Sequence, residues 1–477
     1  MNELLEGSRV GGVRVDGGRR AELRNPYDGN VVALLAQAGA DDARRALEHA
    51  AAYRPRLSRH RRSEILLATA AALQARADAV AALITRESGL SLVDTAREVE
   101  RACQLLRSAA AETLRDDAEC YAGDTSPAES PRRIVTSREP LDGVIFAITP
   151  FNHPLLQVAA KVAPAIATNN RVIVKPSTKT PLSALCLADL LLDAGLPTPM
   201  LQVLVGDAAL LAGSVLHSAD CAMLSFTGSV EVGQRLAAHA GMRRLLVELG
   251  GNDALIVFDD AELDAAARLA AEGAFANSGQ RCTAVKRILV QRRIAATFAE
   301  RLADEAARGW SWGHPTNTRI GTVIDEAAAR AIGLRVAAAI DAGAALLAGH
   351  QRSGAAYAPT VLADVDPRLE LVQRETFGPV APVIAFDTAD DALRIANGTD
   401  YGLSAAVCTQ RLDLVDRLFH ELRVGTLNVW EVPGWRTELA PFGGVKASGL
   451  GHKEGVREAM RGCTTIKSLS LPWGLPR

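Results

Sequence analysis

The chain has 477 residues, enough for several domains, and its 53 basic and 55 acidic side chains leave a formal net charge of −2. This balance gives no overall attraction for nucleic acid or for an anionic membrane surface. No stretch of about 18 uncharged apolar residues occurs, so the sequence predicts a protein that neither spans a membrane nor binds nucleic acid.

The seven cysteines are an odd number and widely spaced, and none lies in a C-x-x-C pair or in a His/Cys cluster with metal-ligand spacing. Residues 1–16 carry acidic side chains and no apolar run, unlike a signal peptide. Unpaired thiols fit a reducing compartment. We therefore expect a cytoplasmic protein without a metal site.

Apolar runs alternate with alanine-rich helical patterns from residue 144 onward, which is typical of parallel sheets covered by helices. The first series predicts strands at 144–148, 171–175, 201–205 and 222–226. It predicts helices at 155–167 and 182–194, and a third helix that follows the strand at 201–205 and ends at residue 216. The second series, from about residue 248, predicts strands at 255–258, 287–291 and 380–386 and helices at 259–277 and 292–307. The expected fold class is α/β, with two doubly wound domains.

Residues 119–140 interrupt this alternation. They are polar at first and then regain β-branched character at 134–136. Two interpretations remain open here, a long surface loop or a protruding pair of strands that meets a partner subunit.

Cys282 follows Gly279, Gln280 and Arg281, and these neighbours indicate an exposed thiol. The thiolate is the reactive form of cysteine, and an adjacent guanidinium lowers the thiol pKa. The sequence thus predicts an ionised nucleophile at Cys282. The alternative is a small apolar side chain that is simply packed.

Three further positions follow predicted strands and carry polar chemistry. Glu248 comes just before two glycines and is either a partly desolvated base with a raised pKa or an ordinary turn residue. Asn152 is either an amide donor for a developing oxyanion or a turn former. Gly228 and Ser229 join a strand to a helix, a geometry that presents N–H groups to a pyrophosphate.

Together these motifs resemble the aldehyde dehydrogenase superfamily, and the resemblance covers nearly the whole chain. The motifs that carry it occur in the family's order, with 34 residues between Glu248 and Cys282: Asn152, Lys175, Gly228-Ser229, Glu248, Cys282, 375–379 and the late signature Pro441-Phe442-Gly443-Gly444. The resemblance implies two Rossmann-like domains and a small β oligomerisation extension. It places the NAD(P)-binding domain at 1–118 and 141–247, with 446–460 returning to it, and the catalytic domain at 248–445. It places the oligomerisation strands of a homodimer or homotetramer at 119–140 and 461–477.

The resemblance also implies the chemistry. Cys282 would attack the aldehyde carbon, Asn152 would hold the oxyanion, and Glu248 would activate water to hydrolyse the thioacyl enzyme. Retention of Glu248 argues against a CoA-acylating dehydrogenase, and retention of all three residues argues against a non-catalytic relative. The positions implied for NAD or NADP are Thr149, Pro150, Lys175, Ser177, Thr178, Gly206, Gly228, Ser229, Glu248, Leu249, Glu375 and Phe377. Thr178 replaces the glutamate of many members, which would repel a 2′-phosphate, so NADP should be tolerated.

Five side chains are expected in the substrate funnel, namely Arg101, His153, Arg281, Thr283 and Arg436. Each basic residue also has an ordinary explanation, as part of a solvated helix face, a turn or a surface ion pair. A cluster of guanidinium groups with an imidazole suits a phosphonate or phosphate better than an alkyl chain, so the expected substrate is a small anionic aldehyde. The runs 151–154, 280–282 and 433–439 resemble the phosphonoacetaldehyde dehydrogenases, which predicts oxidation of phosphonoacetaldehyde to phosphonoacetate. Sulfoacetaldehyde, succinate semialdehyde, lactaldehyde and glyceraldehyde 3-phosphate stay open as alternatives.

Overall fold

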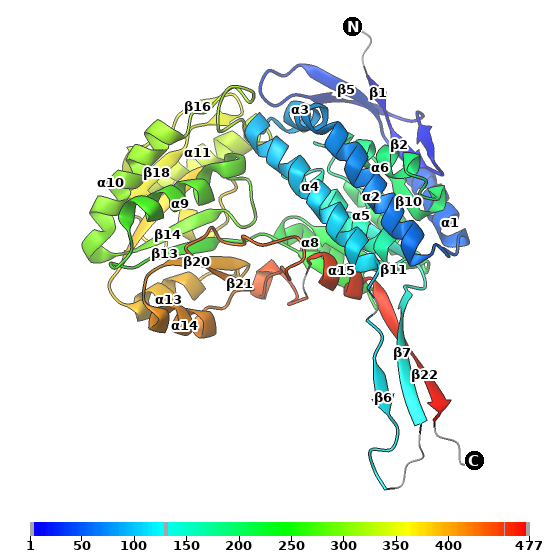
Figure 1. Cartoon of the computed structure of the whole chain (residues 1–477). Helices are drawn as coiled ribbons and strands as arrows, with labels where there is room; N and C mark the ends of the chain where they lie inside the picture. Colours follow the sequence, from blue (N-terminus) through cyan, green and yellow to red (C-terminus); the bar gives the residue numbers. More distant parts are fainter. Residues whose placement is uncertain (1–3, 116, 128–131, 453, 474–477) are drawn as a thin grey trace.

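The computed structural model describes residues 4–115, 117–127, 132–452 and 454–473. The predicted segments 1–118, 119–140, 446–460 and 461–477 each include positions that lie outside the described residues. Two large sheets, each covered by helices, form the body of the molecule (Figure 1). A narrow sheet made of β6, β7 and β22 extends away from this body (Figure 1).

The first large sheet has the strand order β12-β11-β8-β9-β10-β2-β3. Its five strands from β12 to β10 run parallel, so their carboxyl ends share one edge. The chain leaves β8 toward β9 and β10 on one side and returns to β11 and β12 on the other, which puts the topological switch point between β8 and β11. The strand bounds are β2 Ser8–Val10, β3 Val13–Val15, β8 Val144–Ile148, β9 Arg171–Lys175, β10 Leu201–Val203, β11 Cys221–Thr227 and β12 Arg244–Glu248.

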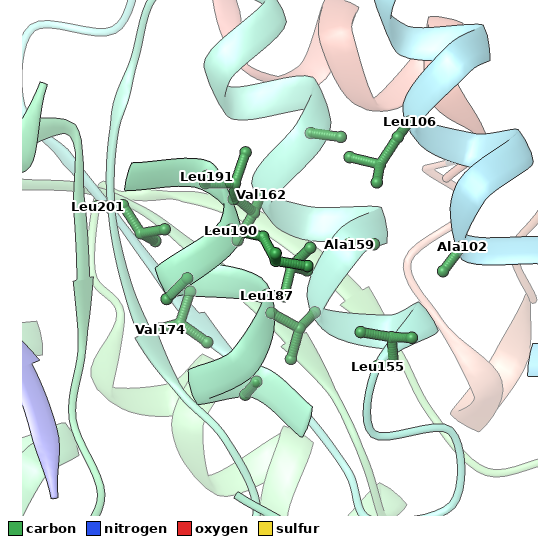
Figure 2. Close-up of a cluster of buried hydrophobic side chains, with 14 of the residues drawn as sticks. Ala102, Leu106, Leu155, Ala159, Val162, Val174, Leu187, Leu190, Leu191 and Leu201 are labelled. Carbon is green, nitrogen blue, oxygen red and sulfur yellow. The ribbon is translucent and has the colours of Figure 1, made fainter. Parts of the chain in front are cut away.

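Helices cover both faces of this sheet because each presents an apolar stripe to it. Figure 2 shows part of the core, where leucines of α6 lie beside Ala159 and Val162 of α5, and Leu106 of α4 belongs to the same cluster. Each fully buried leucine contributes about 1.5–3 kcal/mol. One face carries α2 Arg59–Ala75, α3 Ala77–Ser88, α4 Leu92–Thr113, α5 Leu156–Ala167, α6 Leu182–Asp193 and α15 Val456–Gly462, and the other α1 Ala40–Ala52, α7 Ala208–Leu216 and α8 Val230–His239.

The second large sheet has the order β15-β18-β19-β14-β13-β20-β21 and is parallel except at β15. Its strands are β13 Asp253–Val257, β14 Val285–Gln291, β15 Ala345–Ala348, β18 Thr360–Ala363, β19 Val380–Phe386, β20 Ser404–Cys408 and β21 Thr426–Val429. Its helices are α9 Leu263–Phe275, α10 Arg292–Gly309, α11 Glu326–Asp341, α12 Glu370–Gln373, α13 Ala389–Asn397 and α14 Leu412–Glu421. The two doubly wound sheets confirm the predicted fold class.

Three smaller sheets complete the fold. In the narrow sheet, β22 pairs antiparallel with β7 from Thr464 opposite Pro140 to Pro472 opposite Arg132, so the surface-loop interpretation of 119–140 is wrong for its described residues. The strands of the smaller sheets are β6 Cys120–Ala122, β7 Arg132–Pro140 and β22 Thr464–Pro472, then β1 Leu5–Glu6, β4 Arg20–Arg24 and β5 Val31–Ala36, then β16 Arg352–Ser353 and β17 Ala356–Tyr357.

The predicted helix at 259–277 is too long at both ends. Glu262 caps α9 by accepting the N–H groups of Asp264 and Ala265, so the helix begins at Leu263. It ends at Phe275 because Asn277 turns to a left-handed conformation. In the described part of the chain no single helix is long and apolar enough to cross a bilayer, although the bent pair α2 and α3 passes on length and composition alone.

Candidate active site

The loop that carries Cys282 begins with a left-handed turn. Asn277, Ser278 and Gly279 have φ angles of 59°, 55° and 68°. Asparagine and glycine tolerate this region, whereas serine is strained there, and such strain clusters at functional sites. A Cβ on Gly279 would overlap the backbone of Gly378, so the turn packs directly on the 375–379 motif.

The side chain of Asn152 lies against the same loop. Its Nδ2 donates to the backbone oxygen of Gln280 at 2.8 Å, and its own backbone oxygen accepts from Asn277 Nδ2 at 3.0 Å. Asn152 is only 6 % exposed. One N–H of its amide is therefore used to fix the side chain, and the second remains for another acceptor.

Glu248 ends β12 and is 3 % exposed. A Cβ on Gly443 would lie 2.5 Å from Glu248 Oε1, so the late glycine-rich signature packs on this carboxylate. A Cβ on Gly250 would overlap the carboxylate of Glu375, and one on Gly251 would overlap the backbone oxygen of Cys282. The two glycines after Glu248 are thus required for the motifs of both domains to meet.

The thiol of Cys282 is half-buried, and burial raises its pKa to about 11. The Lys286 ammonium opposes this rise, and the carboxylates of Asp253 and Glu375 add to it. The half-buried thiol with a raised pKa thus differs from the exposed, ionised thiol that its sequence neighbours predict. Burial outweighs the nearby positive charges because the thiolate loses its hydration.

Arg281 interacts electrostatically with the Cys282 thiol, but its hydrogen bonds go to the end of a helix. Its NH2 group donates to the backbone oxygens of Glu272 and Gly273 at 3.1 and 2.7 Å. These carbonyls belong to the last turns of α9, and they draw the guanidinium toward the helix end. Burial lowers the pKa of Arg281, and the nearby Glu272 and Asp94 carboxylates oppose that change.

Lys286 is a site residue that the sequence interpretation missed. Its Nζ donates to the backbone oxygens of Arg281 at 2.7 Å and Cys282 at 2.8 Å and lies 3.2 Å from Glu375 Oε1. The signal was a lysine inside the apolar strand β14, where a charge needs compensation.

The cofactor positions predicted from the resemblance gather at the carboxyl edge of the first sheet. Thr149 Oγ1 and Thr227 Oγ1 are buried there with no hydrogen-bond partner among the described residues. Lys175 is 4 % exposed, and burial lowers its pKa to about 8. Ser229 caps α8, so the helix N-terminus faces the same edge.

The remaining cofactor positions border this group. Thr178 is exposed, Ser177 Oγ accepts from the N–H of Lys179, and Phe377 meets Phe151 edge to face at 5.9 Å. Unpartnered hydroxyls, a buried cation and a helix N-terminus on one edge fit a dinucleotide with its phosphates. Also in this region lie Pro150 after β8, Gly206 after β10, Gly228 after β11 and Leu249 after β12.

A cavity of about 990 Å³ opens onto Cys282. The five predicted substrate residues all line it, so the structure brings together Arg101, His153, Arg281, Thr283 and Arg436. The apolar stripe of α4 faces the core, with Val99, Cys103, Leu106 and Ala110 buried. Arg101 projects from α4 on the cavity side.

The arginines of this cavity differ in what they already bind. Arg101 Nε pairs with Glu438 Oε1 at 2.8 Å, and Arg97 NH1 pairs with Glu272 Oε1 at 3.0 Å. Arg436 forms no ion pair with a carboxylate among the described residues. Its guanidinium stacks 3.6 Å from the ring centroid of Phe442, and its NH1 donates to the oxygen of Gly434 at 3.2 Å.

Two other cavity residues are held by neighbours. His153 Nδ1 lies 3.7 Å from Glu98 Oε2, while Glu98 Oε1 accepts the N–H groups of Leu155 and Leu156 at 2.8 and 2.9 Å. Glu98 was also missed, because its carboxylate meets the 152–156 turn only in the folded chain. Thr283 lies against the backbone of Gly434, where a Cβ would overlap it.

The sequence profile described as "Aldehyde dehydrogenase family" matches residues 13–469. The chain belongs to this family. The 3-sulfolactaldehyde dehydrogenase of Priestia aryabhattai is 36% identical to it over 455 residues, 95% of each chain. The mitochondrial succinate-semialdehyde dehydrogenase of Arabidopsis thaliana is 37% identical over 476 residues, 97% of this chain and 88% of that one.

Solved aldehyde dehydrogenases share the whole fold. The NADP-dependent glyceraldehyde-3-phosphate dehydrogenase of Bacillus halodurans, crystallised with NADP, matches with a TM-score of 0.95 at 32% identity, over 98% of this chain and 100% of that one. Both NAD-dependent and NADP-dependent enzymes are among the matching structures. The chain is therefore an NAD(P)-dependent aldehyde dehydrogenase that oxidises a small aldehyde.

Proposed function

We propose that this dehydrogenase oxidises a small aldehyde whose far end carries one negative charge, a sulfonate or a carboxylate. The guanidinium of Arg436 supports this most directly, because it lines the same cavity as Cys282 and its buried Nε has no hydrogen-bond partner among the described residues. A desolvated guanidinium without a carboxylate favours an anionic ligand. Arg281 Nε is also buried without a partner.

The charges of the cavity favour a singly charged ligand over a phosphonate. Arg97 and Arg101 are already neutralised by Glu272 and Glu438, and the lining contains more carboxylates than arginines. A phosphonate, like a phosphate, carries nearly two negative charges near neutral pH, so the excess of carboxylates in the lining would repel it more strongly than a singly charged group. Phosphonoacetaldehyde is therefore the second candidate, favoured only by the two guanidinium groups, of Arg281 and Arg436, that line the cavity together with Cys282.

In the proposed reaction the Cys282 thiol gives its proton to water, and the sulfur bonds to the aldehyde carbon as the carbonyl π electrons move onto the oxygen. The free N–H of the Asn152 amide and the backbone N–H of Cys282 hold the resulting oxyanion. NAD or NADP, held at the carboxyl edge of the first sheet by residues such as Lys175 and Ser229, would supply the acceptor for the hydride of that carbon. Glu248 then takes a proton from water, whose oxygen displaces Cys282 to release the carboxylic acid.

We also propose the division of labour between the parts of the fold. The first sheet with 446–460 would bind the cofactor and present Asn152, 248–445 would carry Glu248 and Cys282, and β6, β7 and β22 would join subunits in a dimer or tetramer. Ile466 and Leu469 on β22 support the last assignment, since these apolar side chains are 61 % and 58 % exposed.

Steady-state kinetics with a panel of aldehydes tests the substrate. The panel contains succinate semialdehyde, sulfoacetaldehyde, 3-sulfolactaldehyde, phosphonoacetaldehyde, glyceraldehyde 3-phosphate, lactaldehyde and uncharged butanal, each with NAD and with NADP. One charge-assisted contact contributes about 1.5–3 kcal/mol, so kcat/KM should favour the sulfonate or carboxylate aldehydes over butanal by roughly 10- to 150-fold. Equal values across the panel would overturn the anionic-substrate proposal.

Two controls separate the mechanism from the specificity. The Cys282→Ser protein should form no covalent acyl intermediate by mass spectrometry and should show no turnover with any aldehyde. Added coenzyme A should neither accelerate the reaction nor appear in the product. A thioester product would contradict hydrolysis through Glu248 while leaving the identity of the substrate untouched.

A further inference from the structure

Lys286 occupies an unusual place in the second domain. It is 3 % exposed at the start of β14, and its ammonium uses its three N–H donors on three different partners. Two of these partners are backbone oxygens of the nucleophile loop, at Arg281 and Cys282, and the third is the Glu375 carboxylate. The same ammonium lies 5.9 Å from the ring centroid of Phe377.

We propose that Lys286 is a positioning residue that fixes the loop carrying Cys282 and supplies the main positive charge facing its thiolate. This inference deepens the proposed function, since it rests on Cys282 as the nucleophile. A buried lysine bound to two successive carbonyls of one loop holds the backbone in a single conformation. The left-handed turn before Cys282 leaves that loop strained, and a fixed anchor at its far end offsets the strain.

The charges around Cys282 come from several elements. Asp253 at the start of β13 is 2 % exposed, and its carboxylate accepts from the N–H and hydroxyl of Ser404. Glu375 faces the thiol from the loop after α12, and Arg436 faces it from the 433–442 segment. Among the neighbouring charges Lys286 most strongly lowers the pKa of Cys282. Without it, two buried carboxylates would face the thiol with the guanidinium groups of Arg436 and Arg281 as the remaining positive charges.

Site-resolved alkylation tests this directly. The whole protein is treated with iodoacetamide across a pH series, and labelling of the Cys282 peptide is followed by mass spectrometry. In Lys286→Met the midpoint of the profile should move to higher pH, because the thiolate loses the cation that most strongly lowers its pKa. A shift of one pKa unit reduces the thiolate about tenfold below the midpoint, so labelling at pH 8 should slow by about tenfold or more.

Two further variants test the direction in which charge moves the pKa of Cys282. Lys286→Arg keeps the charge and should recover part of the lost rate. Glu375→Gln removes a carboxylate that faces the thiol and should move the Cys282 midpoint to lower pH. If Lys286→Met unfolds, Lys286→Gln takes its place, because its amide keeps N–H donors for the loop but carries no charge; an unchanged Cys282 midpoint in that variant would overturn the charge role.

The chain offers two matched controls. Exposed Cys120 reports general reactivity within the same sample. Lys446 also donates to two backbone oxygens, of Asn397 at 3.1 Å and Thr399 at 2.5 Å, so Lys446→Met loses a similar anchor away from the thiol. The proposal fails if Lys286→Met leaves the Cys282 midpoint in place, or if Lys446→Met moves it equally. Since alkylation requires no aldehyde, turnover by Cys282→Ser would overturn the proposed function separately.

Discussion

Both walls of the substrate cavity carry arginines, but the arginines of one wall are ion-paired with carboxylates and, in the part of the chain that the structure describes, the arginine of the other wall is not. On the α4 wall Arg101 is 40 % exposed and ion-paired with Glu438, and Arg97 is paired with Glu272. On the wall formed by 433–442, burial and the charge of Arg101 lower the pKa of Arg436, which stacks on Phe442 without a carboxylate partner among the described residues. An arginine that is already neutralised in the folded protein has little attraction left for a ligand. The difference teaches that charge counting along the sequence overestimates the positive field of a cavity.

Asn152→Ala should have the largest effect of the three substitutions that probe this comparison. The Asn152 amide donates to the backbone oxygen of Gln280 in the nucleophile loop and, among the described residues, not to a charged side chain of either wall. Loss of an oxyanion donor typically costs about 10²- to 10³-fold in kcat. We expect this loss to be the same for butanal and for succinate semialdehyde, measured by steady-state kinetics. A loss that depends on the charge of the substrate would assign Asn152 to recognition instead.

Arg436→Leu should come second and should discriminate between substrates. Removing one charge-assisted contact lowers kcat/KM for the sulfonate or carboxylate aldehyde by about 10- to 150-fold, with little change for butanal. Arg107→Leu is the matched control, since Arg107 lines the same cavity from α4. If kcat/KM for the anionic aldehyde falls by the same factor in both variants, the substrate responds to the total charge of the cavity. Arg436 would then have no role that sets it apart from the arginines of the α4 wall.

The sheet and its loops were predictable because local patterns decide them. The apolar run at 144–148 became β8 with all five residues buried, and the polar residues after each parallel strand necessarily share one edge. Glycines beside Glu248 and Cys282 then allow the two loops to approach closely, and Asn152 joins them through its hydrogen bond to Gln280.

The state of each charged side chain was not predictable in the same way. The pKa of Cys282 depends on burial and on Asp253 and Glu375, which are distant in sequence. Arg281 bonds to carbonyls at the end of α9, and that end is set by a left-handed turn that Asn277 and Ser278 signal only weakly. Partners chosen by tertiary packing leave no local pattern.

Arg101→Leu should have the smallest effect, because it removes a partly exposed ion pair worth about 0–1 kcal/mol. Its consequence is indirect. Glu438 is 9 % exposed and already interacts with Arg436, so once Arg101 is gone this carboxylate competes with the substrate for Arg436. We expect kcat/KM for the anionic aldehyde to fall by no more than about fivefold, within the energy of that exposed pair. The double variant Arg101→Leu/Glu438→Gln should regain the lost activity in the same assay, since it removes the competitor. A loss as large as that of Arg436→Leu, without recovery in the double variant, would show that Arg101 leaves Glu438 to bind the substrate itself.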